Sequence, residues 1–129
     1  MTQEDKILLL TDLCARLPYN VKVRYDRIPP PGWKMSDTHV DGYLSSIEPN
    51  WSIANGYQPQ IICSGTLCGI GDVRSYLRPM SEISNLISAK EFTQLSGIEL
   101  IDWYNANHID YRGLIEKNLA IKAPKDMYK

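Results

Sequence analysis

Apolar residues at the start of the chain recur every three or four positions, as they do along one face of an α-helix. The members of this stripe are Ile7, Leu10, Leu13, Cys14 and Leu17. Thr2 is a favourable N-cap residue, and Pro18 ends the helix because proline disfavours a helical conformation in the residue before it. The pattern therefore predicts an amphipathic helix over residues 1–17 that packs on the sheet of its own domain, with Cys14 as a small core residue.

From residue 19 the pattern changes to a strict alternation of apolar and polar residues. One side of this segment carries Tyr19, Val21, Val23 and Tyr25. Such alternation predicts an antiparallel strand over residues 19–27 whose apolar side is buried. The prolines at 29–31 then leave the sheet, because proline donates no ladder hydrogen bond, and we expect a stiff surface connection there.

Four more segments in the middle of the chain have the composition of short strands separated by turn residues. They are residues 40–47, 51–54, 60–64 and 73–78. Together with the first strand, they predict a meander of about five strands within residues 19–78. The glycine-rich stretch 64–71 lacks the lysine of a phosphate-binding loop and the spacing of a dinucleotide-binding loop. We therefore interpret its glycines as tight turns between strands.

The pattern becomes helical again after Pro79. Ser81 is predicted to cap a helix over residues 82–88. The side of this helix that is expected to face the core carries Ile83, Leu86 and Ile87.

Two further helices are predicted before the end of the chain. The first covers residues 98–105, where Ile98, Ile101, Trp103 and Tyr104 supply bulk. The second is a short helix that begins at Asp110, a favourable N-cap residue. The predicted helical region therefore spans residues 81–121, and the polar residues 122–129 are expected to form a loosely held tail.

These elements predict a single α+β domain over residues 1–129. It consists of an N-terminal helix, a small twisted antiparallel sheet or partial barrel of about five strands, and a helical C-terminal third. The composition agrees with this prediction, because 129 residues with 43% hydrophobic and 22% charged residues are typical of one globular domain.

Charge and targeting signals narrow the classes of function. A net charge of -1 gives no general attraction to phosphate backbones, so binding of nucleic acid is not expected from charge. The first residues lack the basic region of a signal peptide, and the apolar run at 7–10 is too short to cross a bilayer. We therefore expect a cytoplasmic protein that does not associate with membranes.

The three cysteines indicate reduced thiols and no metal site. Cys14, Cys63 and Cys68 cannot all pair within one chain. Cys63 and Cys68 are five positions apart and both histidines are distant in sequence, so the usual spacing of zinc ligands is missing. We predict neither a structural metal nor a cofactor.

One short segment could carry catalytic chemistry. Residues two apart on a strand share a face, so Asp37, His39 and Asp41 would place two carboxylates around one imidazole. Such a cluster could orient a general base or hold a divalent metal, as in a small hydrolase or nuclease. The alternative interpretation is a solvated strand face beside a loop.

The aromatic residues are mostly of the kind that has a polar tip. The chain has three tryptophans and eight tyrosines but one phenylalanine, a balance that suits interfaces. Exposed together on the sheet, Trp33, Tyr43, Trp51 and Tyr57 would bind a protein partner or stack the bases of a single-stranded nucleic acid. The alternative is that they fill the core and cover the sheet edges.

Two segments in the second half of the chain carry a resemblance. They are Tyr76–Ser81 and Trp103–Leu119, the latter with Asp110-Tyr111-Arg112-Gly113-Leu114-Ile115-Glu116-Lys117 at its centre. Both resemble signatures of a family of small uncharacterised proteins from gut anaerobes, often found in prophage or mobile-element regions. The family has no established catalytic residues to carry over. Its members tend to have glycine where this chain has Asn118, which favours a left-handed C-cap at that position.

Most residues of the second signature have a structural interpretation as caps or core contacts. His108, Tyr111 and Arg112 are the exceptions, and we take them as further candidate binding residues. The sequence as a whole favours a non-enzymatic accessory or protein-interaction protein of a phage or mobile element, with a protein partner. The alternatives are the hydrolase or nuclease based on Asp37, His39 and Asp41, and a weak binder of single-stranded nucleic acid.

Overall fold

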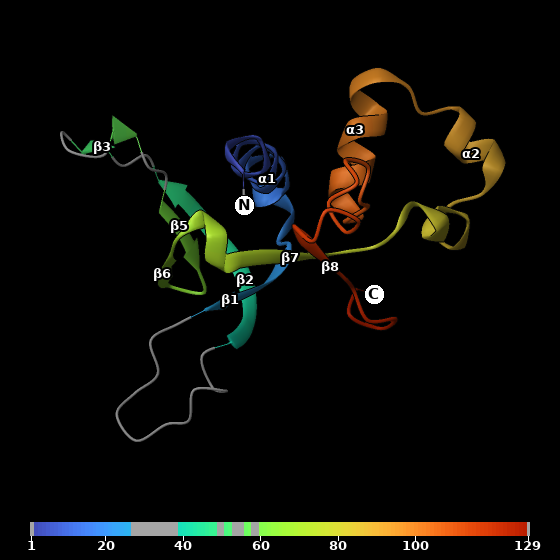
Figure 1. Cartoon of the computed structure of the whole chain (residues 1–129). Coiled ribbons are helices and arrows are strands. Elements are labelled where there is room, and N and C mark those ends of the chain that lie inside the picture. Colours follow the sequence, from blue (N-terminus) through green and yellow to red (C-terminus); the bar gives the residue numbers. More distant parts are fainter. Residues whose placement is uncertain (1, 27–38, 49–50, 53–55, 58–59, 129) are drawn as a thin grey trace. The chain divides into compact units, whose positions relative to one another are not determined.

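The computed structural model describes residues 2–26, 39–48, 51–52, 56–57 and 60–128 (Figure 1). It has the predicted α+β class, with a helix at the N-terminus and an open, mostly antiparallel sheet in the strand order β6-β5-β2-β1-β7-β8. The chain forms two compact units, Met1–Ser75 and Tyr76–Lys129. The expectation of a single domain stays a prediction. Among the described residues, no helix has the length and apolar character needed to cross a membrane.

The N-terminal helix α1 covers Gln3–Arg16, which confirms the predicted element. Thr2 caps it as expected: its hydroxyl accepts a hydrogen bond from the backbone N–H of Asp5 at 3.1 Å. The Asp5 carboxylate accepts the backbone N–H of Thr2 in return, so two backbone donors at the helix start are satisfied.

The buried face of α1 differs from the predicted stripe. It consists of Leu9, Asp12, Leu13 and Arg16. Ile7 is 57% exposed and Cys14 is exposed, so the prediction of Cys14 as a core residue is wrong. The physical reason is an ion pair: Nε of Arg16 lies 2.8 Å from the Asp12 carboxylate, and both side chains are fully buried. Because the two charges neutralise each other, a face with polar residues can turn inward, which a count of apolar positions cannot detect.

The predicted strands of the sheet are largely confirmed. They form β1 (Lys22–Asp26), β2 (His39–Glu48), β5 (Gln60–Cys63) and β7 (Val73–Leu77). Strand β1 lies between β2 and β7 and pairs with both in antiparallel register. Val21, Val23 and Tyr25 are buried as the alternation predicted, whereas Tyr19 lies in a 3₁₀ helix before the strand.

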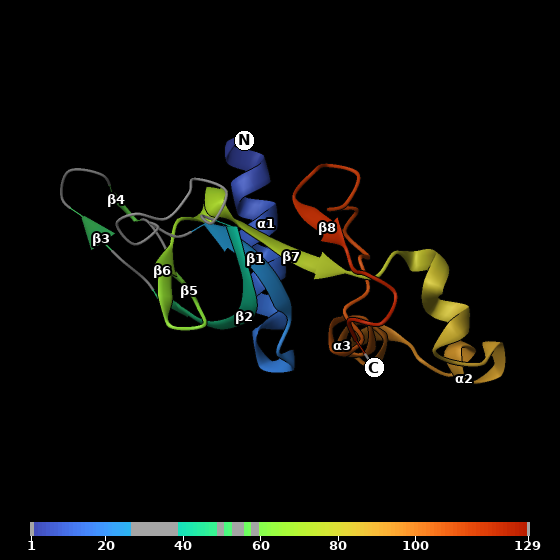
Figure 2. The same cartoon turned by 90° about the horizontal axis from the view of Figure 1, so that it is seen from below.

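Two strands of this sheet were not predicted, β6 (Thr66–Cys68) and β8 (Ala120–Lys122). Strand β6 pairs with β5 through a tight turn at Ser64 and Gly65. Both turn residues have a positive φ, 47° and 84°, so the interpretation of this part of the glycine-rich stretch as a turn is confirmed. The part of the sheet from β6 to β1 is curled (Figure 2). As a result, Sγ of Cys68 on β6 lies 3.9 Å from the carbonyl oxygen of Asp26 on β1.

A separate two-stranded sheet pairs β3 (Trp51–Ser52) with β4 (Gly56–Tyr57). Strand β3 falls within the predicted strand 51–54, whose last two residues lie outside the described part of the chain. The proline-rich segment also lies outside the described residues.

The second unit mixes helices, turns and a strand, so a helical C-terminal third stays a prediction. It contains a 3₁₀ helix (Met80–Asn85), α2 (Ala89–Thr93), α3 (Gly97–Ala106) and β8 (Ala120–Lys122). Helix α3 confirms the element expected over 98–105. The helix expected over 82–88 is instead the 3₁₀ helix, whose N-cap is Pro79 and not Ser81, and Leu86 after it is 38% exposed rather than inward-facing.

The short helix predicted from Asp110 does not form within the fully described residues 110–119. These residues make a turn, and β8 follows directly. The physical reason is Gly113, whose φ of 76° is incompatible with a right-handed helix. The segment nevertheless closes as a helix end would, since Asn118 has a φ of 60° and the backbone N–H of Leu119 donates to the carbonyl of Leu114 at 2.9 Å. The left-handed conformation predicted for Asn118 is therefore confirmed.

Candidate functional site

The predicted acidic cluster around His39 is arranged by cross-strand pairing. Asp37 lies outside the described residues, while His39 and Asp41 stand on the first half of β2 opposite Asp26 and Arg24 of β1. Nδ1 of His39 contacts the Asp26 carboxylate, and Asp41 lies 3.5 Å from Nε of Arg24. The pairs are well exposed, with 62% of the His39 side chain and 57% of the Asp41 side chain accessible.

His39 and Asp41 therefore have separate cross-strand partners. Within the described part of the chain, no three His, Cys, Asp or Glu side chains are grouped so that they could hold a metal ion. The catalytic role of Asp37, His39 and Asp41 stays a prediction. The partner that the sequence analysis missed is Asp26, since pairing across strands cannot be read from sequence spacing.

Of the four aromatic residues predicted to form a binding surface, the structure describes the side chain of one, Tyr43. Tyr43 is 48% exposed on β2, and Nζ of Lys22 lies 5.6 Å from the centre of its ring. Trp33 lies outside the described residues, and Trp51 and Tyr57 can be placed only as a backbone pair between β3 and β4. The idea of an aromatic binding surface stays a prediction.

The two signature segments meet within the second unit. The backbone N–H of Arg78 donates to the carbonyl of His108 at 2.7 Å, and the carbonyl of Arg78 accepts the N–H of Asp110 at 2.8 Å. The guanidinium of Arg78 also donates to the carbonyl of Asn107 at 3.1 Å and to that of Tyr128 at 2.5 Å. Arg78 thus connects β7, the end of α3 and the last described residues.

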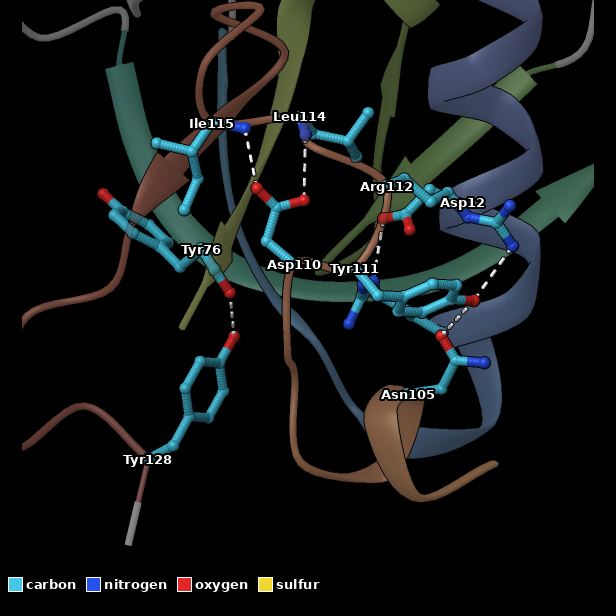
Figure 3. A network of polar contacts seen from close by, with 10 residues as sticks. Asp12, Tyr76, Asn105, Asp110, Tyr111, Arg112, Leu114, Ile115 and Tyr128 are labelled. Atoms are coloured by element: carbon cyan, nitrogen blue, oxygen red, sulfur yellow. Dashed lines mark hydrogen bonds and ion pairs between the residues drawn. The ribbon is translucent and has the colours of Figure 1, made fainter. Parts of the chain in front are cut away.

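The Asp110 carboxylate organises the turn that follows it (Figure 3). Its two oxygens accept the backbone N–H groups of Leu114 at 2.8 Å and Ile115 at 3.0 Å. Asp110 is 7% exposed, and Ile109 and Leu114 beside it are fully buried. The side chain therefore has a capping role, as the sequence predicted, although it caps a turn and not a helix.

Tyr111 and Arg112, which had no structural interpretation from sequence, belong to a small polar and aromatic network. The Tyr111 hydroxyl donates to the side-chain oxygen of Asn105 at 3.1 Å, and its ring stacks on Tyr104 with centres 5.2 Å apart. The Arg112 guanidinium donates to the same hydroxyl at 2.9 Å and lies over the Tyr111 ring. These contacts tie the turn to α3, so they account for both residues without a ligand.

His108 is 8% exposed and has a φ of 59°, an uncommon conformation for a residue other than glycine. Its ring stacks on that of Tyr128, with centres 3.9 Å apart and planes inclined by 24°. The Tyr128 hydroxyl donates to the carbonyl of Tyr76 at 2.8 Å (Figure 3). The segment expected to be a loose tail is therefore anchored at Tyr128.

Helix α3 presents apolar side chains to solvent. Ile98 is 79% exposed and Ile101 is 42% exposed, and their spacing of three residues places them on one side of the helix. Both were predicted only to supply bulk. The sequence does contain a signal that not all the apolar residues of α3 can be buried, because they occur on every side of the helix and Trp103 and Tyr104 occupy the side that packs.

The cysteines have environments that suppress thiolate formation. Burial raises the pKa of Cys63 to about 12, and the neighbouring Cys68 thiol acts in the same direction. Burial also raises the pKa of Cys68, and the carboxylates of Asp72 and Asp26 add to this increase. Neither thiol is therefore suited to act as a nucleophile at neutral pH.

Comparisons with protein-family models, with curated proteins and with solved structures find no match to this chain. The family resemblance stays a prediction, and the function has to be argued from the residues themselves.

Proposed function

We propose that this chain is a non-enzymatic interaction protein of a phage or mobile element and that it binds a protein partner through the exposed side of α3. The observation that carries this proposal is the exposure of Ile98, at 79% the highest among the exposed large apolar side chains of the described residues. Ile101 extends the apolar surface by one helical turn. The phage or mobile-element setting rests on the family resemblance.

An exposed isoleucine pair on a helix fits recognition of another protein better than catalysis. An amphipathic helix can place apolar side chains at positions i and i+3 into a groove of a partner. Burying such a side chain contributes roughly 1.5–3 kcal/mol to binding. Ile98 and Ile101 could together supply enough free energy to anchor a partner, provided that polar contacts surround them.

The proposal is tested by affinity capture from the native host with the whole chain as bait. Partners are identified by mass spectrometry, purified and measured again by titration calorimetry. The test variant is the double substitution Ile98→Asp and Ile101→Asp, which should weaken binding more than tenfold.

Ile7→Asp serves as the matched control. Ile7 is also an isoleucine exposed on a helix, with 57% of its surface accessible, but it lies on α1. This variant should bind like the unmodified chain, and both variants should keep the circular dichroism spectrum of the parent. Equal binding by the α3 variant and the control would refute the role of α3.

A second candidate function is a hydrolase in which His39 acts as a general base. The contact between Nδ1 of His39 and the Asp26 carboxylate favours it, because a carboxylate at Nδ1 fixes the orientation of an imidazole. The structure-based form of this hypothesis uses Asp26 as the orienting residue in place of Asp37 and Asp41.

Turnover of chromogenic phosphate and carboxylate esters tests this candidate. His39→Gln and Asp26→Asn should each abolish activity, whereas Asp41→Asn, which removes the exposed partner of Arg24, should leave it unchanged. Absence of turnover in the unmodified chain, or equal activity in all variants, would rule this mechanism out.

A further inference from the structure

The last described residues, 124–128, form a strap that is anchored at Tyr128 by its side chain and its backbone carbonyl. Pro124, Lys125 and Asp126 are exposed, and the backbone N–H of Met127 donates to the carbonyl of Pro124 in a turn. The strap starts beside β7, where the N–H of Ala123 donates to the carbonyl of Leu77 at 2.8 Å. Between this bond and Tyr128, three of the strap residues are exposed to solvent.

Tyr128 lies in a cradle made by Tyr76, Arg78 and His108. Together these three residues contact the hydroxyl, the ring and the backbone carbonyl of Tyr128. The carbonyl of Tyr76 accepts the Tyr128 hydroxyl, the imidazole of His108 stacks on the ring, and Arg78 donates to the backbone carbonyl. The Arg78 guanidinium also lies 5.4 Å from the centre of the ring. The cradle therefore recognises a hydroxyl, an aromatic face and a peptide carbonyl together.

The cradle has contacts of its own besides those to the strap. The backbone of Arg78 pairs with the carbonyl of His108 and the N–H of Asp110, and its side chain also bonds to the carbonyl of Asn107. The neighbouring Leu77 and Ile109 are fully buried. The geometry of the cradle should thus persist when the tyrosine leaves it.

We infer that this cradle is a recognition site for a tyrosine in an extended polypeptide, that the strap of residues 124–128 is its internal occupant, and that a partner polypeptide can displace the strap. This site goes beyond the proposed function, because it uses none of the α3 residues on which that proposal rests. The ligand class follows from the contacts: phenylalanine lacks the hydroxyl that the Tyr76 carbonyl accepts, so a phenylalanine peptide leaves a polar group without its partner.

The test measures binding of a fluorescent peptide with the sequence Pro-Lys-Asp-Met-Tyr-Lys to the full chain by fluorescence anisotropy. The substitution Tyr128→Ala empties the cradle, so this variant should bind the peptide at least tenfold more tightly than the unmodified chain, in which the strap competes. Replacing the tyrosine of the peptide by phenylalanine should weaken binding about 2–12-fold, the equivalent of one neutral hydrogen bond. Replacing it by alanine should abolish binding.

Lys125→Ala is the matched control, because it changes an exposed strap residue and leaves Tyr128 in place. It should bind the peptide as weakly as the unmodified chain. The His108 ring signals in an NMR spectrum provide a second readout: they should shift in Tyr128→Ala and return toward their original positions when the peptide is added.

The milder substitution Tyr128→Phe keeps the proposal testable if Tyr128→Ala does not fold. Removing the hydroxyl alone should weaken the strap and raise the affinity for the peptide severalfold. A folded Tyr128→Ala or Tyr128→Phe variant that binds no better than the unmodified chain would overturn the inference. Equal binding of the tyrosine, phenylalanine and alanine peptides would overturn it as well.

Discussion

Arg78 and Ile109 form an isolated parallel bridge within the second unit of the chain. Arg78 lies in the segment Tyr76–Ser81 and Ile109 lies in Trp103–Leu119, so the bridge joins these two segments. Both backbone groups of Arg78 take part in it, and its side chain adds bonds to the carbonyls of Asn107 and Tyr128. Backbone and side-chain hydrogen bonds of one residue thus hold the two segments together.

The first prediction concerns this arginine. Arg78→Lys should lower the free energy of unfolding by about 1–3 kcal/mol, because an ammonium cannot hold two separated carbonyls as the planar guanidinium does. Urea denaturation measures the change. Arg74→Lys on β7 is the control, since Arg74 donates to the carbonyls of Gly71 and Val73, which lie close to it in sequence. Equal losses in the two variants would contradict the special role of Arg78.

The second prediction concerns the cap at Asp110. Asp110→Ala should cost about 1–3 kcal/mol of unfolding free energy, because the N–H groups of Leu114 and Ile115 lose their acceptors in a buried site. Asp110→Asn keeps one oxygen acceptor and should cost less. Asp126→Ala, which alters an exposed carboxylate of the strap, should change stability by no more than about 0.5 kcal/mol. Thermal and urea denaturation of the three variants provide the comparison.

The third prediction concerns the ion pair inside α1. Asp12→Ala should destabilise the protein by about 3–5 kcal/mol, because it removes the carboxylate that neutralises the fully buried Arg16. Replacing both residues together, Asp12→Leu with Arg16→Met, should be less harmful than Asp12→Ala alone. A double variant less stable than the single one would show that loss of the ion pair itself, and not the buried charge that Asp12→Ala leaves behind, accounts for the destabilisation.

The fourth prediction is a decline in stability at alkaline pH that depends on Cys63. Its pKa is about 12 in the folded chain against an ordinary value of 9.0, so between these values the thiol ionises in the unfolded chain before it does so in the folded one. The folded state then holds more protons, and stability falls as pH rises, by at most about 1.4 kcal/mol per pH unit.

The measurement compares urea denaturation of the unmodified chain and Cys63→Ala at pH 8, 9, 10 and 11. Other side chains that titrate in this range contribute equally to the pH dependence of the unfolding free energy in both proteins, so their contributions cancel in the difference. The difference in unfolding free energy between the unmodified chain and Cys63→Ala should decrease with rising pH. The unmodified chain loses the stability linked to the Cys63 proton, whereas the variant has no such proton to lose. A constant difference would mean that Cys63 ionises alike in the folded and unfolded chains.

The sequence alone determined those elements whose signals are local. Thr2 and the stripe that follows it predicted α1, because capping and helical periodicity act within a few residues. The alternation through Val21, Val23 and Tyr25 predicted β1 and the side of it that is buried. The left-handed Asn118 was also readable, since asparagine tolerates a positive φ where glycine is preferred.

Tertiary structure decided everything that depends on which distant residues come together. The inward face of α1 was set by the Asp12 and Arg16 pair, and the surroundings of His39 by a cross-strand neighbour, Asp26. The cradle for Tyr128 was set by residues about 20 to 50 positions away in sequence, whose contacts hydrophobic patterning does not encode. Patterning reports how each residue compares with its neighbours in the chain, whereas burial and partnership are fixed only when remote segments pack against one another.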